Sequence, residues 1–160
     1  MLHFGMKMPF SFEEFLGMCT NVVSENDIEI IKACKEISGS SVEESQETLQ
    51  KWHTFDTALR NALVRIRAAR KHKDPDKYLR QNGYQDSHIT NLAMNAYKHP
   101  SILESEKILD KERWQALEDL ASCHQFDIDA LIVYTHKLLI LEKHNRINTA
   151  DKTRELEKVI

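Results

Sequence analysis

Apolar residues recur at every third or fourth position from residue 49 to residue 69, and this spacing constrains the fold more than any other feature of the sequence. Positions three and four apart lie on one face of an α-helix, so the spacing predicts a long helix that packs along its length against neighbours. The apolar residues of this face are Leu49, Trp52, Phe55, Leu59, Ala62, Ile66 and Ala69. A capping box at residues 41–44, with the sequence SVEE, predicts the start of the helix.

Boundary signals predict further helices on either side of the long one. Ser11 and Ser24 each have the pattern of a helix N-cap, and we expect the second of these helices to end at Ser38-Gly39. Asp74-Pro75 is expected to end the long helix and begin another, because proline disfavours the α conformation in the residue before it and suits a first helical turn. That next helix is predicted to run to Asn82-Gly83.

The second half of the chain has the same helical spacing. Apolar faces predict helices over residues 86–98 and 101–122, and the face of the second of these is expected to begin at Ile102. Asp127 is predicted to cap the last long helix. The apolar face of that last helix consists of Leu131, Tyr134, Leu138 and Leu141. We expect the pattern to weaken after His144-Asn145 and a separate short helix to close the chain.

Together with the composition, these elements predict an all-α protein. The 160 residues include only 4 glycines and 3 prolines, which is typical of a helix-rich globular chain. We expect a single-domain bundle of about six to seven amphipathic helices over residues 11–160, preceded by an N-terminal extension over residues 1–10. The predicted main core consists of Trp52, Phe55, Leu59, Leu63, Trp114, Leu131, Tyr134 and Leu138.

The sequence contains no recognisable motif for catalysis or nucleotide binding. Glycine-rich phosphate loops, the nucleophile elbow G-x-S-x-G and the zinc motif H-E-x-x-H are all absent. Two histidine pairings come nearest to a constellation, His53 with Asp56 and His136 with His144, and we interpret these histidines as solvent-facing or hydrogen-bonded. We therefore expect a protein that is not an enzyme and has no catalytic residues, no cofactor and no metal.

The cysteines and the apolar runs indicate the compartment. Cys19, Cys34 and Cys123 are odd in number and form no C-x-x-C pair, so they predict neither a disulfide framework nor a zinc site. They are typical of small buried residues in a reducing environment. No uncharged apolar run approaches the length of about 18 residues that a membrane span needs, and the N-terminal residues lack a secretion signal. We expect a cytoplasmic protein.

Basic residues are concentrated between residues 65 and 80, in a chain whose net charge is −3. The residues of this run that we expect to bind a protein partner are Arg65, Arg67, Arg70, Lys71, Lys77 and Arg80. Acidic residues dominate on both sides, over residues 11–47 and 101–129, and would repel the phosphates of DNA. Protein docking is therefore favoured over nucleic-acid binding. A second interpretation is structural, because basic side chains at a helix end complement the helix dipole and cover apolar surface.

Three stretches of the sequence carry a resemblance to known proteins. They are FSFEEFLGMC, FDTALRNALVRIRAARKHKDPDKYLR and ERWQALEDLASCHQFDIDALIVYTHKLLILEKHNRI. In order and spacing they resemble an uncharacterised bacterial family encoded among V-type ATPase genes. More distantly they resemble the helical central-stalk piece of the V/A-type ATPases, which is called the d subunit in eukaryotes. The resemblance implies an all-helical, non-catalytic part that caps the membrane rotor ring and receives the central shaft. Because the chain is much shorter than that three-lobed stalk piece, it also implies a reduced version or a part of the architecture.

From this resemblance we expect a non-catalytic subunit or accessory protein of a V-type ATPase or ATP synthase. Its expected partners are the stalk or rotor subunits, with no nucleic acid and with the membrane reached only through the complex. The alternative is a stand-alone cytoplasmic helical adaptor or regulatory protein with another protein partner. An enzyme with an unfamiliar site is a third class, which the missing motifs disfavour.

Overall fold

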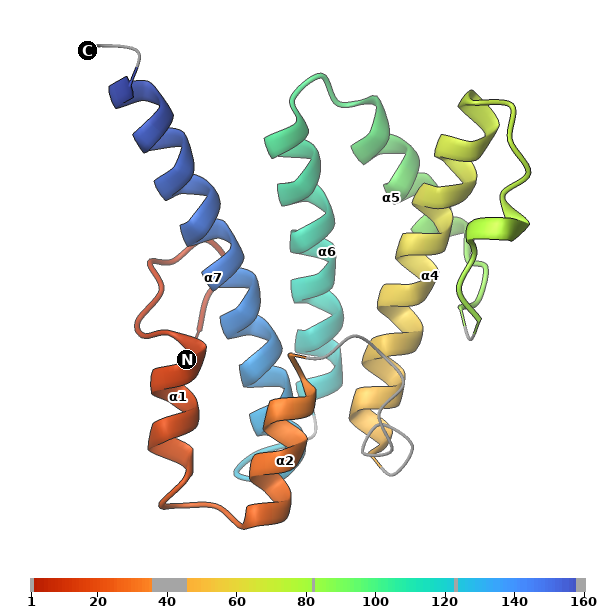
Figure 1. Ribbon diagram of the computed structural model, residues 1–160. Helices are drawn as coiled ribbons and strands as arrows, with labels where there is room; N and C mark the ends of the chain where they lie inside the picture. Colours follow the sequence, from red (N-terminus) through yellow and green to blue (C-terminus); the bar gives the residue numbers. More distant parts are fainter. Residues whose placement is uncertain (1, 36–45, 82, 123, 158–160) are drawn as a thin grey trace. The chain divides into compact units, whose positions relative to one another are not determined.

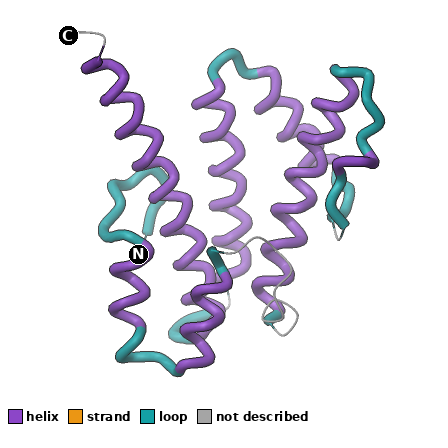
Figure 2. Tube along the Cα trace, viewed as in Figure 1, coloured by secondary structure: helices purple, strands orange, loops and turns teal. Residues whose placement is uncertain are grey.

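The computed structural model describes residues 2–35, 46–81, 83–122 and 124–157. Over these ranges the regular structure consists of six α-helices and one short 3-10 helix, with no strand, so the predicted all-α fold is confirmed (Figure 2). The chain divides into two compact units, Met1–Ser45 with Leu120–Ile160 and Gln46–Asp119, and the single domain predicted over residues 11–160 stays a prediction. Within the described ranges, no helix has both the length and the apolar character that a membrane span needs.

The first unit contains three α-helices that pack on one another (Figure 1): α1 (Phe12–Cys19), α2 (Glu25–Ala33) and α7 (Ile128–Glu157). Aromatic rings hold α1 and the segment before it against α7. The Phe15 ring centroid lies 5.1 Å from that of Tyr134, and the Phe10 ring lies 6.4 Å from the same tyrosine. Leu2 is also buried, so residues near the N-terminus contribute to the core of this unit.

Side-chain caps begin the first two helices, as predicted. Ser11 Oγ accepts a hydrogen bond from the Glu14 N–H at 3.2 Å, and Glu14 Oε2 accepts one from the Ser11 N–H at 2.7 Å, which completes a capping box. Ser24 caps α2 through the Asp27 N–H. The described helix α2 ends at Ala33, earlier than predicted, and Ser38-Gly39 lies outside the described residues.

Helix α7 is one unbroken helix, so the separate terminal helix predicted after His144-Asn145 is wrong. Its predicted cap is correct, because Asp127 Oδ1 accepts a hydrogen bond from the Ala130 N–H at 2.9 Å. The chain beyond Asn145 contains no glycine or proline, and its Arg, Lys and Glu residues favour helix even where the apolar spacing is weak.

The second unit is formed by α4 (Glu47–Arg70), the 3-10 helix η1 (Asp76–Tyr78), α5 (Ser87–Lys98) and α6 (Ile102–Ala121) up to Asp119. Small and branched side chains from the three α-helices form its buried cluster. The members of this cluster are Ala58, Leu59, Ala62, Leu63, Ile89, Ala93, Ala96 and Leu109. Four members of the cluster are alanines, Ala58 and Ala62 on α4 and Ala93 and Ala96 on α5. Because alanine side chains are small, they let the axes of the two helices approach closely.

Three sequence predictions for the second unit need correction. The helix predicted from Asp74-Pro75 to Asn82-Gly83 is only the single turn η1. Ala69 is exposed and Ala68 is buried in its place, while Ile102, predicted on the apolar face of α6, is 83% exposed. The predicted cap at residues 41–44 lies outside the described residues, and the described helix begins at Glu47 after Gln46 as N-cap.

Burial largely supports the predicted core. Trp52, Leu59, Leu63, Trp114 and Leu138 are buried, whereas Phe55, Leu131 and Tyr134 are half-buried. The predicted members divide between the two units, with Leu131, Tyr134 and Leu138 in the first and the others in the second.

Two of the three cysteines are described, and both are buried as predicted. Burial raises the pKa of the Cys34 thiol to about 12, so this side chain stays a protonated apolar group at neutral pH. Cys19 is also buried, and its pKa is raised for the same reason. Cys123 lies outside the described residues.

Candidate docking site

The predicted basic residues lie around a corner where α4 ends and the chain turns back. The Lys71 N–H donates to the carbonyls of Arg67 at 3.2 Å and Ala68 at 3.1 Å, and the Lys73 N–H donates to the Ala68 carbonyl at 3.0 Å. His72 has a φ of 50°, the left-handed conformation that commonly ends helices. These bonds satisfy the last carbonyls of α4 and fix the direction in which the chain leaves the helix.

The segment after the corner is fastened to α4, beside which it returns in green in Figure 1. The buried side chain of Asn61 holds the backbone of Arg80 with two hydrogen bonds, Nδ2 to the carbonyl oxygen at 2.8 Å and the Arg80 N–H to Oδ1 at 3.0 Å. Arg60 Nη1 donates to the Tyr78 carbonyl at 3.2 Å. The corner therefore has a defined shape although its surface is mostly exposed.

The six predicted binding residues do not form one continuous site. Arg67, Arg70, Lys71, Lys77 and Arg80 are exposed, and Arg65 is half-buried. Arg70 is directed toward α5, because its Nη1 lies 2.9 Å from the Tyr97 hydroxyl and its guanidinium lies 5.9 Å from the centre of that ring. The hydrogen bond to Tyr97 raises the pKa of Arg70. Arg70 thus has a contact within the unit.

The structure brings two of the predicted residues, Arg67 and Lys71, into one hollow on the surface of the second unit. The hollow has a volume of about 320 Å³. Its lining consists of Arg60, Val64, Arg67, Ala68, Lys71, Lys73 and Tyr78. Arg60 and Lys73 were not among the predicted binding residues. Arg60 reaches the hollow because the returning segment lies against its own turn of α4.

The hollow is positively charged. It has four cationic side chains and no carboxylate in its lining, and no carboxylate of the described residues forms an ion pair with Arg60, Arg67, Lys71 or Lys73. Burial lowers the pKa of Arg60, the nearby charge of Arg80 lowers it further, and Asp56 partly offsets both effects. Asp74 lies in the same turn but does not line the hollow, and its Oδ1 accepts a hydrogen bond from the Asp76 N–H at 3.1 Å. An anion that entered the hollow would meet unneutralised cations.

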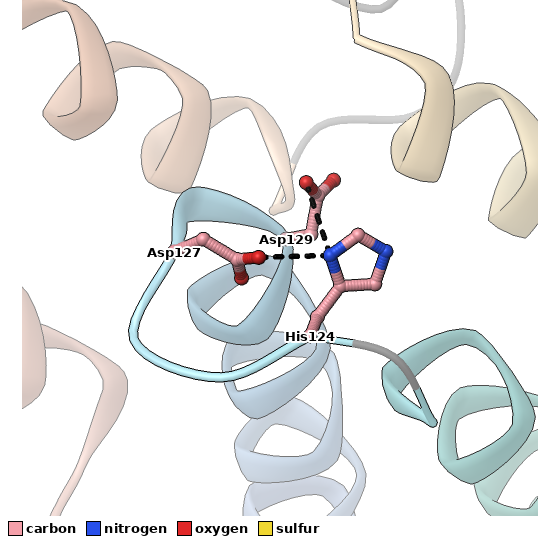
Figure 3. A group of neighbouring side chains, drawn as sticks. All are labelled: His124, Asp127 and Asp129. Carbon is pink, nitrogen blue, oxygen red and sulfur yellow. Dashed lines mark hydrogen bonds and ion pairs between the residues drawn. The ribbon is translucent and has the colours of Figure 1, made fainter.

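A second group of polar side chains lies in the first unit, at the start of α7. Figure 3 shows the Nδ1 atom of His124 directed toward both Asp127 and Asp129. This nitrogen lies 2.8 Å from an Asp127 oxygen and 3.5 Å from an Asp129 oxygen. The bond from the Ala130 N–H and the bond to His124 lower the pKa of Asp127. The residues are types that ligate metals, but they surround a helix N-terminus, whose partial positive charge disfavours a cation. We therefore interpret this group as a helix-capping network.

The sequence prediction of no metal site did not consider this group, whose signal is the spacing H-x-x-D-x-D at residues 124–129. The histidines that were singled out lie elsewhere. His136 is buried rather than solvent-facing, and the His144 ring packs edge-on against Phe4 at a centroid distance of 5.5 Å. His53 is half-buried on α4 and does not line the hollow.

Comparison with known proteins gives a match to a family whose function is unknown. Residues 87–160 match the model of a family described as "Protein of unknown function (DUF2764)". The match covers α5, α6 and α7, so the basic corner lies outside it. Neither the curated proteins nor the solved structures include a significant match to this chain.

Proposed function

We propose that this protein is a non-catalytic subunit or accessory protein of a V-type ATPase or ATP synthase that docks through its basic corner. The class of machine is supported by the resemblance of the three sequence stretches described above. In this proposal the protein acts in the central stalk, between the shaft and the membrane rotor. It reaches the membrane only through the complex and supplies no catalytic group.

The observation that carries the docking role is the set of exposed cations at the end of α4 and in η1. Arg67, Lys71 and Lys77 are exposed and form no ion pair with a described carboxylate, although the chain as a whole is acidic. Clustered charge of one sign speeds encounter with a complementary partner and sets the orientation of binding. The fixed backbone of the corner supports this role, because a rigid surface loses little conformational entropy on binding.

The proposal is tested by affinity purification of the tagged protein from native membranes. We expect the wild-type protein to recover the catalytic subunits of the ATPase together with stalk subunits. A triple variant, R67E/K71E/K77E, should recover much less of them, with a loss that is greatest at low salt because the attraction is screened by ions. Its helical circular dichroism and melting temperature should stay close to those of the wild type, because isolated surface charges contribute little to folding.

A matched control reverses three exposed lysines elsewhere, K32E/K98E/K111E, which changes the net charge equally. This control should recover the ATPase subunits as well as the wild type does. If both triple variants lose the subunits equally, the effect is one of net charge and the corner is not the docking site. If the wild-type protein recovers another soluble partner and no ATPase subunit, the assignment to the ATPase is wrong and the helical adaptor interpretation replaces it.

A further inference from the structure

The hollow at the basic corner combines charge with an apolar floor. Arg60, Arg67, Lys71 and Lys73 supply the cations, while Val64, Ala68 and the ring of Tyr78 supply apolar surface. The volume of about 320 Å³ far exceeds the roughly 10–15 Å³ that holds one water molecule, so the hollow accommodates a ligand of several groups. Its ligand must be anionic and must also offer apolar atoms.

Most of the backbone N–H groups around this hollow are occupied by hydrogen bonds within the protein, whereas phosphate sites in proteins commonly use such groups. Phosphates are usually held by free N–H groups at a helix N-terminus or in a glycine-rich loop. Here the nearby helix end is a C-terminus. The N–H groups that donate within the protein at this corner include those of Lys71, His72, Lys73, Asp76, Tyr78 and Arg80. The partial negative charge of the helix C-terminus also opposes a compact, highly charged anion.

Carboxylate side chains fit these features better than phosphate does. Lys and Arg side chains alone can pair with Asp or Glu, and Arg can do so with two parallel hydrogen bonds. The methylene groups of a glutamate, or an aliphatic neighbour of it, can lie on Val64 and Ala68. Tyr78 is 50% exposed at the rim, where its ring is available for contact with a partner.

We propose that this hollow binds an acidic segment of a partner protein, one that presents at least two carboxylates beside an aliphatic residue. The proposal rests on the proposed function for the identity of the partner, a stalk or rotor subunit, while the chemistry of the hollow stands on the residues that line it. The cations that would pair with these carboxylates are Arg60, Arg67, Lys71 and Lys73, which all line the hollow.

The test is fluorescence anisotropy with a dye-labelled peptide that alternates glutamate pairs with leucine. The full chain should bind this peptide with an affinity that falls as salt is added, and K71E should weaken binding by at least about tenfold, or about 1.4 kcal/mol. Its matched control, K111E, makes the same residue change at an exposed lysine on α6 of the same unit and should bind like the wild type. Replacing the leucines of the peptide by glycine should also weaken binding to the wild type, because the apolar floor then has no partner.

Competitors separate the occupants of the hollow. The labelled peptide is displaced in turn by inorganic pyrophosphate, by duplex DNA and by an unlabelled copy of the peptide. If pyrophosphate or DNA acts at a lower concentration than the unlabelled peptide, the proposal is overturned in favour of a phosphate ligand. Equal loss in K71E and K111E, or no binding by the wild type at low salt, would overturn it as well. A second variant, Y78A, changes the lining of the hollow without changing its charge. If the single variants Y78A and K71E both bind the peptide as the wild type does, the peptide does not bind at this hollow.

Failure of the proposed function is distinguishable from failure of this inference. If the tagged wild-type protein recovers ATPase subunits and K71E recovers them equally, the hollow is not the contact and the ATPase assignment stands. If the wild type recovers no ATPase subunit but binds the acidic peptide in a K71E-sensitive way, the hollow is confirmed and its partner belongs to another complex.

Discussion

The Nε of Arg113 on α6 lies 2.7 Å from the Oδ1 of Asp56 on α4, so one guanidinium ties together two helices of the second unit. Its Nη1 also donates to Asp110 Oδ1 at 3.0 Å, and Asp110 is only 1% exposed. The charges of Asp56 and Asp110 raise the pKa of Arg113 despite its burial, which by itself lowers that pKa. The arginine thus stays charged and compensates a carboxylate that has almost no access to water.

Replacing Arg113 with methionine should destabilise the protein strongly. The change leaves the Asp110 carboxylate buried without Arg113 beside it. We expect the free energy of unfolding to fall by about 3 kcal/mol, which is the low end of the range for breaking a buried ion pair. The low end applies because Asp56, the other partner of Arg113, is partly hydrated. Urea denaturation followed by circular dichroism measures the loss. The double variant R113M/D110L should recover much of it, because the buried Asp110 carboxylate is removed together with its cation and only the partly hydrated Asp56 is left without Arg113. A loss below about 1 kcal/mol in R113M would mean that Asp110 does not depend on Arg113 for its compensation.

Gly83 and Gly17 should respond in opposite directions to substitution by alanine. A Cβ at Gly83 would lie 2.7 Å from Asn61 Nδ2 and 3.3 Å from the backbone nitrogen of Ala58. Because Asn61 is held in place by its two bonds to Arg80, it cannot move aside without losing them. We expect G83A to destabilise by about 1–3 kcal/mol, in the range for overpacking a contact.

The control for this prediction is Gly17, which lies within α1 and has no atom within 4 Å of an added Cβ. Alanine there should raise the free energy of unfolding by about 0.5–1 kcal/mol, because glycine is the weaker helix former. Thermal denaturation of G83A and G17A measures both changes in stability. A stabilising G83A would show that the returning segment does not lie against α4 at this point.

One leucine in each unit tests the cores separately. Leu59 in the second unit and Leu138 in the first are both 0% exposed, so L59A and L138A should each cost about 2–5 kcal/mol of stability. Ile102 is 83% exposed, and I102A should change stability by no more than about 0.5 kcal/mol. Chemical denaturation monitored by circular dichroism is suitable for all three. A loss in L59A or L138A as small as that in I102A would place the helix face concerned at the surface.

His88 should make the contact between α5 and α6 depend on pH. Its Nε2 lies 2.7 Å from Glu112 Oε1, and this hydrogen bond together with the carboxylate charge raises the pKa of His88 above its ordinary value of 6.5. Because the folded state binds the proton more tightly than the unfolded state, the pair stabilises fully below pH 6.5, and the stabilisation is lost as the pH rises through the raised pKa.

Titration of the His88 ring by NMR measures this shift directly. The pKa should fall toward 6.5 in E112Q, which removes the charge but keeps the side-chain shape. E104Q, which changes an exposed glutamate paired with Lys107 elsewhere on α6, should leave the pKa of His88 unchanged. A His88 pKa that is the same in wild type and E112Q would contradict the pairing.

Features of the fold that depend on a few neighbouring residues could be predicted from the sequence. The caps at Ser11, Ser24 and Asp127 are such features, because a cap requires only a side-chain oxygen two or three positions before a free N–H. The buried faces were also mostly correct. Errors arose at helix ends, as at Ala69 and Ile102, where the periodicity continues but no neighbouring element covers the side chain.

The shape of the docking site could not be predicted in the same way. The hollow depends on how the chain turns after α4, which is fixed by the left-handed backbone of His72 and by the bonds of Asn61 to Arg80. Those bonds join residues 19 positions apart, and no local pattern indicates them. The sequence therefore did not predict that Arg60 lines the hollow. It also did not predict that Arg70, a member of the basic run, contacts Tyr97 and does not line the hollow.

The division of the chain into units also determines the order in which its parts can fold on the ribosome. The second unit is continuous in sequence, whereas the first joins α1 and α2 to α7, which is synthesised after the second unit. At about 5–20 residues per second, several seconds separate the emergence of α2 from that of α7, and a continuous unit can fold within that interval. The apolar faces of α1 and α2, which include Phe15 and Ile31, cannot pack against α7 before α7 has been synthesised. Newly made chains should therefore expose these two helices to chaperones until α7 has left the ribosome.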